Sequence, residues 1–189
     1  MAVQGDVRRD EEVAAVFAEI LRELGPLDIL VNNAGYALVK PFLSVTSGEW
    51  TDQIETLAGG YYRCLKAVLP GMVARGRGAV LNIASTCGVR GSAGEAAYAA
   101  ANGAIVALTR SLAAEFGPAG VRINALLVTW AENAFDPADP DHAAFLPAFA
   151  LRRVVTVDEI AKAAVFLCSE AAAGVTGAAL PVDAGFLCG

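Results

Sequence analysis

A short apolar segment that ends in a serine limits what this chain can fold into. Residues 79–84 form a mostly apolar run that ends at Ser85, and a glycine-bearing loop up to Gly94 leads into a helix rich in small residues. Such a run predicts a buried strand, and the helix would return along the sheet. Ser85 at the strand end and Tyr98 at the start of the helix then meet in the crevice where open α/β sheets bind ligands. A hydroxyl and a phenol placed there can polarise a carbonyl group and pass it a proton.

Strands and helices are predicted to alternate along the rest of the chain. Apolar residues recur every three or four positions in the helical segments, whereas the strand segments are short and almost continuously apolar. This alternation is typical of a parallel sheet covered on both faces, so an α/β fold is expected. The length of 189 residues fits one domain, residues 1–189. The predicted strands are 2–7, 27–31, 79–84, 120–127 and 179–183, and the predicted helices are 10–24, 50–75, 95–116 and 157–170.

Composition and charge exclude several classes of function. The net charge of −6 argues against a general binder of nucleic acid or anionic membranes, because phosphate groups select basic surfaces. No apolar run approaches the roughly 18 residues needed to span a membrane, and the first residues do not resemble a secretory signal. The four cysteines are far apart, which predicts reduced thiols in a cytoplasmic protein. Metal binding is not expected, because the single histidine, His142, has no second type of ligand near it in the sequence.

Two motifs together resemble the active site of the short-chain dehydrogenase/reductase family. Ser85 stands thirteen positions before Tyr98, and Leu-Val-Asn-Asn-Ala-Gly occupies residues 30–35. The resemblance covers nearly all of the chain and implies a Rossmann-like, doubly wound parallel sheet in a three-layer α/β/α arrangement. It also implies interconversion of ketones and alcohols with NAD or NADP, in which Ser85 polarises the substrate carbonyl and Tyr98 transfers the proton.

The same resemblance assigns residues to the cofactor. The implied cofactor-binding residues are Asp6, Val7, Asn33, Ala34, Gly35, Tyr98 and Asn102. The first two would flank the adenine, and the three that follow would lie against the ribose. The family's glycine-rich turn, which brings the backbone close to the pyrophosphate, does not occur in the sequence. The chain begins where the family's third strand is expected, so we expect a partial domain that lacks the first two β-α units and binds NAD or NADP weakly or not at all.

Three substitutions fall where the family keeps its reacting groups. The family's lysine four residues after the tyrosine is Asn102 here, its helix asparagine is Leu57, and its Pro-Gly pair is Val128-Thr129. Without a nearby cation a tyrosine keeps a pKa of about 10 and is a poor base near neutral pH, while proton donation by Tyr98 is affected less. Leu57 has no hydrogen-bonding group and is expected to pack in the core. Residues 132–141 are acidic and contain proline, so they are expected to form a mobile, solvated lid over the substrate.

These observations leave three functions open. The first is an oxidoreductase of the family that acts weakly or not at all on a small carbonyl or alcohol substrate. The second is a non-catalytic interaction protein in which helices 50–75 and 95–116 form a dimer, either between two copies or with an intact paralogue of the family. A lyase or dehalogenase without a cofactor is a weaker third alternative, because such members place a basic residue at the position of Asn102.

Overall fold

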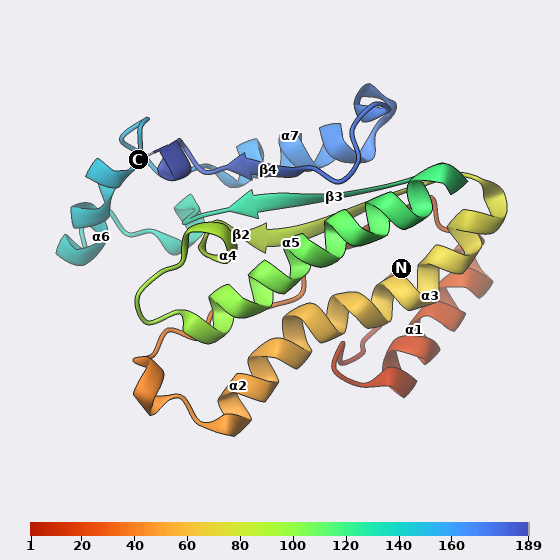
Figure 1. The fold of residues 1–189 in the computed structure, drawn as a ribbon, viewed down its shortest axis with the longest axis horizontal. Coiled ribbons are helices and arrows are strands. Elements are labelled where there is room, and N and C mark those ends of the chain that lie inside the picture. The colour runs from red at the N-terminus through yellow and green to blue at the C-terminus, as the bar shows by residue number, and fades with distance from the viewer. Residues whose placement is uncertain (189) are drawn as a thin grey trace.

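Four parallel strands form one sheet among residues 1–188, the part of the chain that the structure, a computed structural model, describes (Figure 1). Along the sheet the strands follow their order in the chain, so each strand pairs with the one that precedes it. They are β1 (Ile29–Asn32), β2 (Gly78–Ser85), β3 (Val121–Val128) and β4 (Ala179–Val182). A parallel sheet with helices between its strands confirms the predicted α/β fold.

Helices cover the two faces of the sheet unequally (Figure 1). One face carries α1 (Asp10–Leu24), α3 (Gly60–Arg75) and α5 (Ala96–Phe116), and the other carries α7 (Val157–Cys168). The larger core includes the buried side chains of Phe17 from α1, Leu65 from α3 and Ile105 from α5. In the smaller core, Leu167 of α7 packs on the opposite face. These layers match the predicted α/β/α arrangement.

Local signals set the ends of several helices. Helices α2 (Ser47–Ile54) and α7 begin with capping boxes. The side chain of Thr46 or Thr156 accepts a hydrogen bond from the main-chain N–H of the glutamate three residues later, and that glutamate's side chain accepts one from the main-chain N–H of the threonine. Gly25 and Gly76 end α1 and α3 with a positive φ, which glycine adopts without strain. Two short helices lie in the connections after β2 and β3: α4 (Cys87–Arg90) and α6 (Pro140–Phe145).

A π-helical turn divides the predicted helix over residues 50–75. Helix α2 passes into this turn at Glu55–Gly59, and α3 continues from it. Leu57 lies within the turn and is 4% exposed, so the expectation that it packs in the core is confirmed. Its Cδ2 atom lies against the position that a Cβ atom would take on Gly35, so a larger residue there would require the Leu57 side chain to shift. The turn and the chain after β1 are therefore in direct contact.

The predicted strand over residues 2–7 is wrong. Residues 1–6 adopt no regular secondary structure. A strand needs a neighbour for its main-chain groups, and none of the strands in residues 1–188 pairs with this segment. The segment packs against helices instead, with Val7 close to Gly60 of α3. Strand β1 likewise has no described partner on its outer edge, where Ile29 and Val31 are half exposed.

The predicted lid over residues 132–141 contains more structure than expected. It holds a 3-10 turn at Glu132–Ala134 and ends in α6. Trp130 stacks on Phe145 and meets His142 edge-on, with ring centroids 5.5 and 4.7 Å apart. These aromatic contacts join the residues on either side of the segment, which its acidic composition did not predict.

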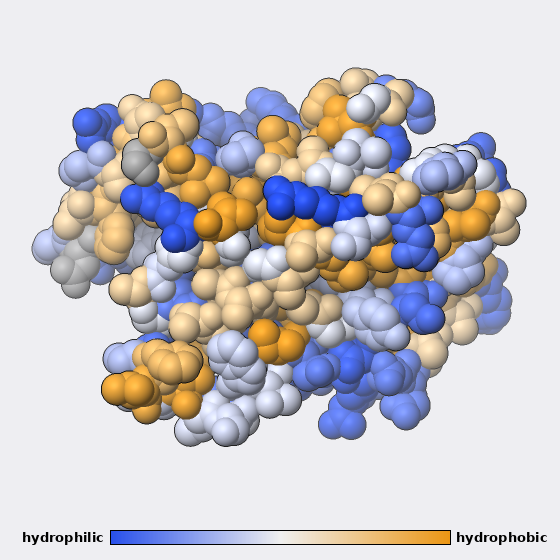
Figure 2. Space-filling view, in the orientation of Figure 1, coloured by the Kyte–Doolittle hydropathy of each residue, from blue (hydrophilic) through white to orange (hydrophobic). Residues whose placement is uncertain are grey.

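The hydropathy of the surface differs between helix α5 and the loop before α2 (Figure 2). Weakly hydrophobic colours follow α5, whose exposed side includes Ala100, Ala104 and Ala107. A more hydrophobic knob lies at the lower left over the 3-10 turn Phe42–Ser44, where Leu43 is almost fully exposed. None of the helices in residues 1–188 combines the length and apolar composition that crossing a membrane requires.

Candidate active site

The two residues predicted to act on a carbonyl group lie next to each other. Ser85 ends β2, and Tyr98 lies in the first turn of α5. Ser85 is buried, and Tyr98 packs partly buried against the larger core. The Ser85 side chain is close enough to lower the pKa of the Tyr98 phenol. The sheet and the returning helix therefore bring the hydroxyl and the phenol together, as their positions in the sequence predict.

Burial controls the acidity of Tyr98. It raises the pKa of the phenol, and the neighbouring Cys87 raises that pKa further. The nearby side chains of Ser85 and Asn102 lower the pKa by less. The groups of residues 1–188 that shift this pKa include no positive charge. Tyr98 is therefore protonated near neutral pH and is a weak base.

The Asn102 side chain is bonded within the protein at both of its polar atoms. Its Oδ1 accepts a hydrogen bond from the main-chain N–H of Ser85 at 2.8 Å, and its Nδ2 donates to the main-chain carbonyl of Tyr98 at 2.9 Å. The residue is only 1% exposed. Because the residue is buried, its second N–H has little access to a ribose hydroxyl, so its part in cofactor binding stays a prediction.

Tyr61 belongs to the site, and sequence reasoning missed it. Its hydroxyl donates to the main-chain carbonyl of Ile83 at 2.8 Å, two residues before Ser85. Burial raises the pKa of Tyr61, and the nearby Tyr98 adds to the rise. The helical period predicts only that Tyr61 faces inward. Its bonding partner depends on where a neighbouring strand ends, which no local pattern encodes.

A buried thiol adjoins the Ser85–Tyr98 pair. Cys87 opens α4 directly after β2, and its main-chain N–H donates to Oγ of Ser85 at 3.3 Å. Burial raises the pKa of the Cys87 thiol to about 11, so the thiol is protonated near neutral pH and is a poor nucleophile. All four cysteines are unpaired. Among the described residues, no three histidine, cysteine or acidic side chains lie together as metal ligands would.

Buried polar side chains tie the strands together below the site. The Nδ2 of Asn32 in β1 donates to Oδ1 of Asn82 in β2 at 2.8 Å. The Nδ2 of Asn82 then donates to Oγ1 of Thr109 in α5 at 2.9 Å. All three residues are at most 4% exposed. This ladder links two strands and the helix that carries Tyr98.

The residues predicted to contact the ribose directly follow β1, the strand at the edge of the described sheet. Asn33, Ala34 and Gly35 are exposed. The first two line a groove of about 250 Å³ along β1, together with side chains of α1 and α3. Leu57 covers Gly35, and an apolar side chain at this point offers no hydrogen bond to a proton relay.

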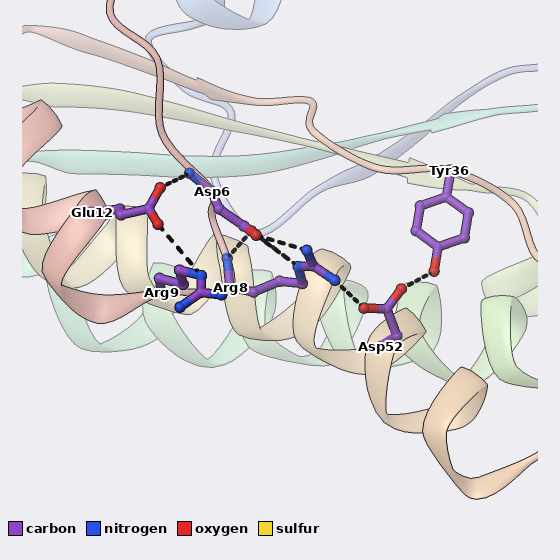
Figure 3. Close-up of polar contacts among 6 residues, drawn as sticks. All are labelled: Asp6, Arg8, Arg9, Glu12, Tyr36 and Asp52. Atoms are coloured by element: carbon purple, nitrogen blue, oxygen red, sulfur yellow. Dashed lines mark hydrogen bonds and ion pairs between the residues drawn. The ribbon is translucent and has the colours of Figure 1, made fainter.

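The predicted adenine end holds an exposed network of ion pairs (Figure 3). Arg8 donates from Nε and Nη2 to the Asp6 carboxylate at 3.0 and 2.7 Å, and from Nη1 to Asp52. Tyr36, which follows Gly35, also donates its hydroxyl to Asp52. The hydrogen bonds from Arg8 lower the pKa of Asp6 to about 2. Both carboxylate oxygens of Asp6 are therefore engaged within the protein.

Residues 1–188 lack part of what a dinucleotide site needs. Asn33 and Ala34 line an open groove, but most of the other side chains that line it are apolar. A pyrophosphate needs the main-chain N–H groups of a glycine-rich turn, and none of the strand-to-helix connections in residues 1–188 has that glycine spacing. The first turn of α1 carries Asp10, Glu11 and Glu12, whose charges repel a phosphate. The described residues alone do not form a complete NAD(P) site.

Known proteins that resemble this chain include reductases and dehydrogenases. Residues 1–187 match the family model described as Enoyl-(Acyl carrier protein) reductase. The 3-oxoacyl-[acyl-carrier-protein] reductase FabG of Pseudomonas aeruginosa is 38% identical over 95% of this chain and 74% of its own length. The inactive 2-(S)-hydroxypropyl-CoM dehydrogenase 2 of Xanthobacter autotrophicus is 39% identical over 97% of this chain and 83% of its own length.

A solved structure agrees with these sequence matches. A Sinorhizobium meliloti protein described as a short-chain alcohol dehydrogenase superposes with a TM-score of 0.94 at 33% identity. The superposition covers 100% of this chain and 76% of that protein. These matches agree with the two sequence motifs, Ser85 with Tyr98 and the asparagine motif at residues 30–35. The chain therefore belongs to the short-chain dehydrogenase/reductase family.

Proposed function

We propose that this chain retains the proton-donating part of the family's carbonyl chemistry but acts weakly or not at all as an enzyme. Ser85 would hydrogen-bond to the oxygen of a small ketone and polarise its carbonyl, and Tyr98 would give that oxygen a proton as the alcohol forms. NAD(P)H, when bound, would supply the hydride. The observation that carries the proposal is the neutral setting of Tyr98, where burial raises the pKa and Asn102 supplies an amide instead of a cation.

The raised pKa of Tyr98 favours one direction of the reaction. Ketone reduction needs a protonated phenol, which is the form present near neutral pH. Alcohol oxidation needs the phenolate as a base, and this form is scarce there. Any remaining activity is therefore expected as reduction of a carbonyl substrate and not as oxidation of an alcohol.

Binding of NAD or NADP is proposed to be weak. The adenine would lie near Asp6 and Val7, and the remaining contacts would come from Asn33, Ala34, Gly35 and Tyr98. The carboxylate of Asp6 is already paired with Arg8, and the pyrophosphate finds no glycine-rich turn in residues 1–188. A ligand at this end would therefore have to compete with bonds inside the protein.

Titration of the purified chain with NADH and NADPH tests the proposal first. Calorimetry and nicotinamide fluorescence are expected to show no binding, or a Kd weaker than about 1 mM. Tyr98→Phe is the matched control, because it removes one hydroxyl and keeps the ring. Two results together would contradict the proposal that the enzyme is weak or inactive: micromolar binding of the cofactor, and ketone reduction that Tyr98→Phe abolishes.

Restoring the family's groups separates lost chemistry from lost geometry. The variant Asn102→Lys combined with Leu57→Asn is made in a chimera that joins this chain to the first two β-α units of an active family member. Ketone reduction that appears only with both substitutions would support the proposal that Ser85 and Tyr98 remain suitably placed. A chimera that binds NADPH and keeps the Ser85 amide protected from hydrogen exchange, yet shows no turnover, would count against it.

A non-catalytic interaction protein of the cytoplasm is the second candidate function. Helices α2 and α5 pack against each other, and the exposed side of α5 carries alanines that allow a further helix to come close. We propose that helices 50–75 and 95–116 form a dimer, with a second copy or with an intact paralogue. A cytoplasmic paralogue that supplies a complete cofactor site would make such pairing useful even when this chain has no activity.

Analytical ultracentrifugation tests the second candidate. The wild-type chain is expected to sediment as a dimer, alone or when mixed with an active paralogue. Ala104→Arg on the exposed side of α5 should reduce it to a monomer, and Ala14→Arg on the exposed side of α1 should not. A chain that is monomeric under both conditions would remove this candidate.

A further inference from the structure

Strand β2 extends beyond its neighbour at the candidate site. Strand β1 pairs with β2 only as far as Asn82, whereas β2 continues to Ser85. The main-chain groups of alternate residues in a parallel strand point to the same side. The N–H of Ala79 bonds to the carbonyl of Asp28 on the β1 side, so the odd-numbered residues of β2 face that side. Ile83 and Ser85 therefore direct main-chain groups to where β1 has already ended.

Two side chains occupy the place of a strand partner there. The Tyr61 hydroxyl donates to the carbonyl of Ile83 at 2.8 Å, and Oδ1 of Asn102 accepts from the N–H of Ser85 at 2.8 Å. Tyr61 is 2% exposed and Asn102 is 1% exposed, so bulk water does not reach these bonds. A buried main-chain group without a partner is costly, which gives each of the two side chains a defined task.

We infer that Tyr61 and Asn102 are positioning residues that hold the end of β2, and with it the Ser85 hydroxyl, in place. The inference rests on the proposed roles of Ser85 and Tyr98. Asn102 acts on both of them, because its Nδ2 donates to the main-chain carbonyl of Tyr98 while its Oδ1 holds Ser85. One amide thereby sets the distance between the end of the strand and the first turn of α5.

This task differs from the one that the family resemblance assigns to the position. The amide is buried and bonded to the main chain of both neighbours, so it positions them without adding charge. Tyr61 lies on the neighbouring helix α3, so the strand end is held from two helices at once. The arrangement maintains the geometry of the Ser85–Tyr98 pair whether or not a cofactor is bound.

Hydrogen exchange of the ¹⁵N-labelled full chain tests the inference without any need for turnover. Asn102→Leu has a similar size but no acceptor, and the Ser85 amide is expected to exchange about tenfold faster in it than in the wild type. The amide of Leu81, within the paired part of β2, should keep its rate. Asn102→Asp retains an acceptor oxygen and should restore most of the protection at Ser85.

A second pair of variants tests the contribution of Tyr61. Tyr61→Phe removes one hydroxyl and should shift the carbonyl carbon resonance of Ile83, with a smaller increase in exchange at Ser85. Tyr62→Phe is the matched control, because Tyr62 is 53% exposed on the same helix. It should change neither signal. If Asn102→Leu fails to fold, this milder pair decides the question.

Unchanged exchange at Ser85 in a folded Asn102→Leu variant would overturn the inference, as would equal effects of Tyr61→Phe and Tyr62→Phe. These readouts need neither substrate nor cofactor, so they can succeed when the chain has no activity. If turnover is found, the Asn102 variants are expected to lower kcat and leave KM nearly unchanged. Normal exchange in the variants of a chain that does catalyse reduction would contradict the positioning role and leave the proposed function intact.

Discussion

The two ends of the candidate site are built in opposite ways. At the reacting end, Ser85, Tyr98 and Asn102 are joined by hydrogen bonds in a largely buried environment. At the adenine end, Asp6 and Arg8 form an exposed ion pair that extends to neighbouring side chains (Figure 3). Buried hydrogen bonds are costly to break because the groups left behind have no water, whereas exposed ion pairs contribute little.

The difference separates the parts of the candidate site that also serve the fold from those that do not. The bonds of Asn102 and Tyr61 complete the main chain of β2, so they stabilise the protein without a ligand. The carboxylate of Asp6 accepts from the main-chain and side-chain N–H groups of Arg8, but at the surface, where water can replace these bonds. We therefore expect the family's geometry to persist where it belongs to the core and to be weakened where only a cofactor needs it.

The largest effect is expected for Asn82→Leu near the reacting end. It should lower the free energy of unfolding by about 3 kcal/mol, because the Asn32 amide and the Thr109 hydroxyl each lose a buried hydrogen-bond partner. Urea unfolding followed by circular dichroism measures this. Asp52→Asn at the adenine end should leave the midpoint nearly unchanged. Similar losses in the two variants would break the contrast between the ends.

A smaller loss is expected for Leu57→Asn. The side chain is 4% exposed and packs on Gly35, so a buried amide and a lost apolar contact should together cost about 2 kcal/mol. Leu57→Met keeps the volume and should cost less than about 1.5 kcal/mol in thermal unfolding. If Leu57→Asn is as stable as the wild type, then a polar partner is available there and the apolar account of this position is wrong.

The smallest effect is expected for Arg8→Gln, and it should depend on pH. Hydrogen bonds from Arg8 lower the pKa of Asp6 to about 2 in the folded protein, from an ordinary value of 3.8. A carboxyl group whose pKa is lowered by folding stabilises the protein above that ordinary value, and this stabilisation is lost as pH falls through the lowered pKa.

The wild type should therefore melt at a slightly higher temperature than Arg8→Gln at about pH 6, and the two melting temperatures should converge towards about pH 2. Differential scanning calorimetry across this range is the measurement. A difference that stays constant down to low pH would mean that Arg8 acts by packing and not by its charge.

Much of the fold could be predicted because each element carries its own signal. Strand β2 and helix α5 begin within one residue of the predicted segments 79–84 and 95–116. Residues 2–7 have a partly apolar pattern as well, yet they form no strand. Pairing is a property of two segments, so an apolar pattern alone cannot guarantee it.

The site shows the same limit at the level of side chains. The spacing of Ser85 and Tyr98 predicts their contact, because the strand end and the helix start fix both positions. The bonds of Asn102 and Tyr61 depend on where β1 stops, and the pairing of Arg8 depends on the path of an irregular segment. These are tertiary facts that neither periodicity nor a motif contains.

The pKa of the Tyr98 phenol shows directly whether the buried reacting end lacks a positive charge, as we claim. Phenolate absorbance is followed as pH rises in the wild type and in Tyr98→Phe, and the difference between the two curves isolates Tyr98. Circular dichroism reports over what range the fold persists. We predict that Tyr98 remains protonated beyond its ordinary pKa of 10.0, because burial raises that pKa. Formation of the phenolate near about pH 7 would contradict the claim, since it would require a positive charge acting on Tyr98.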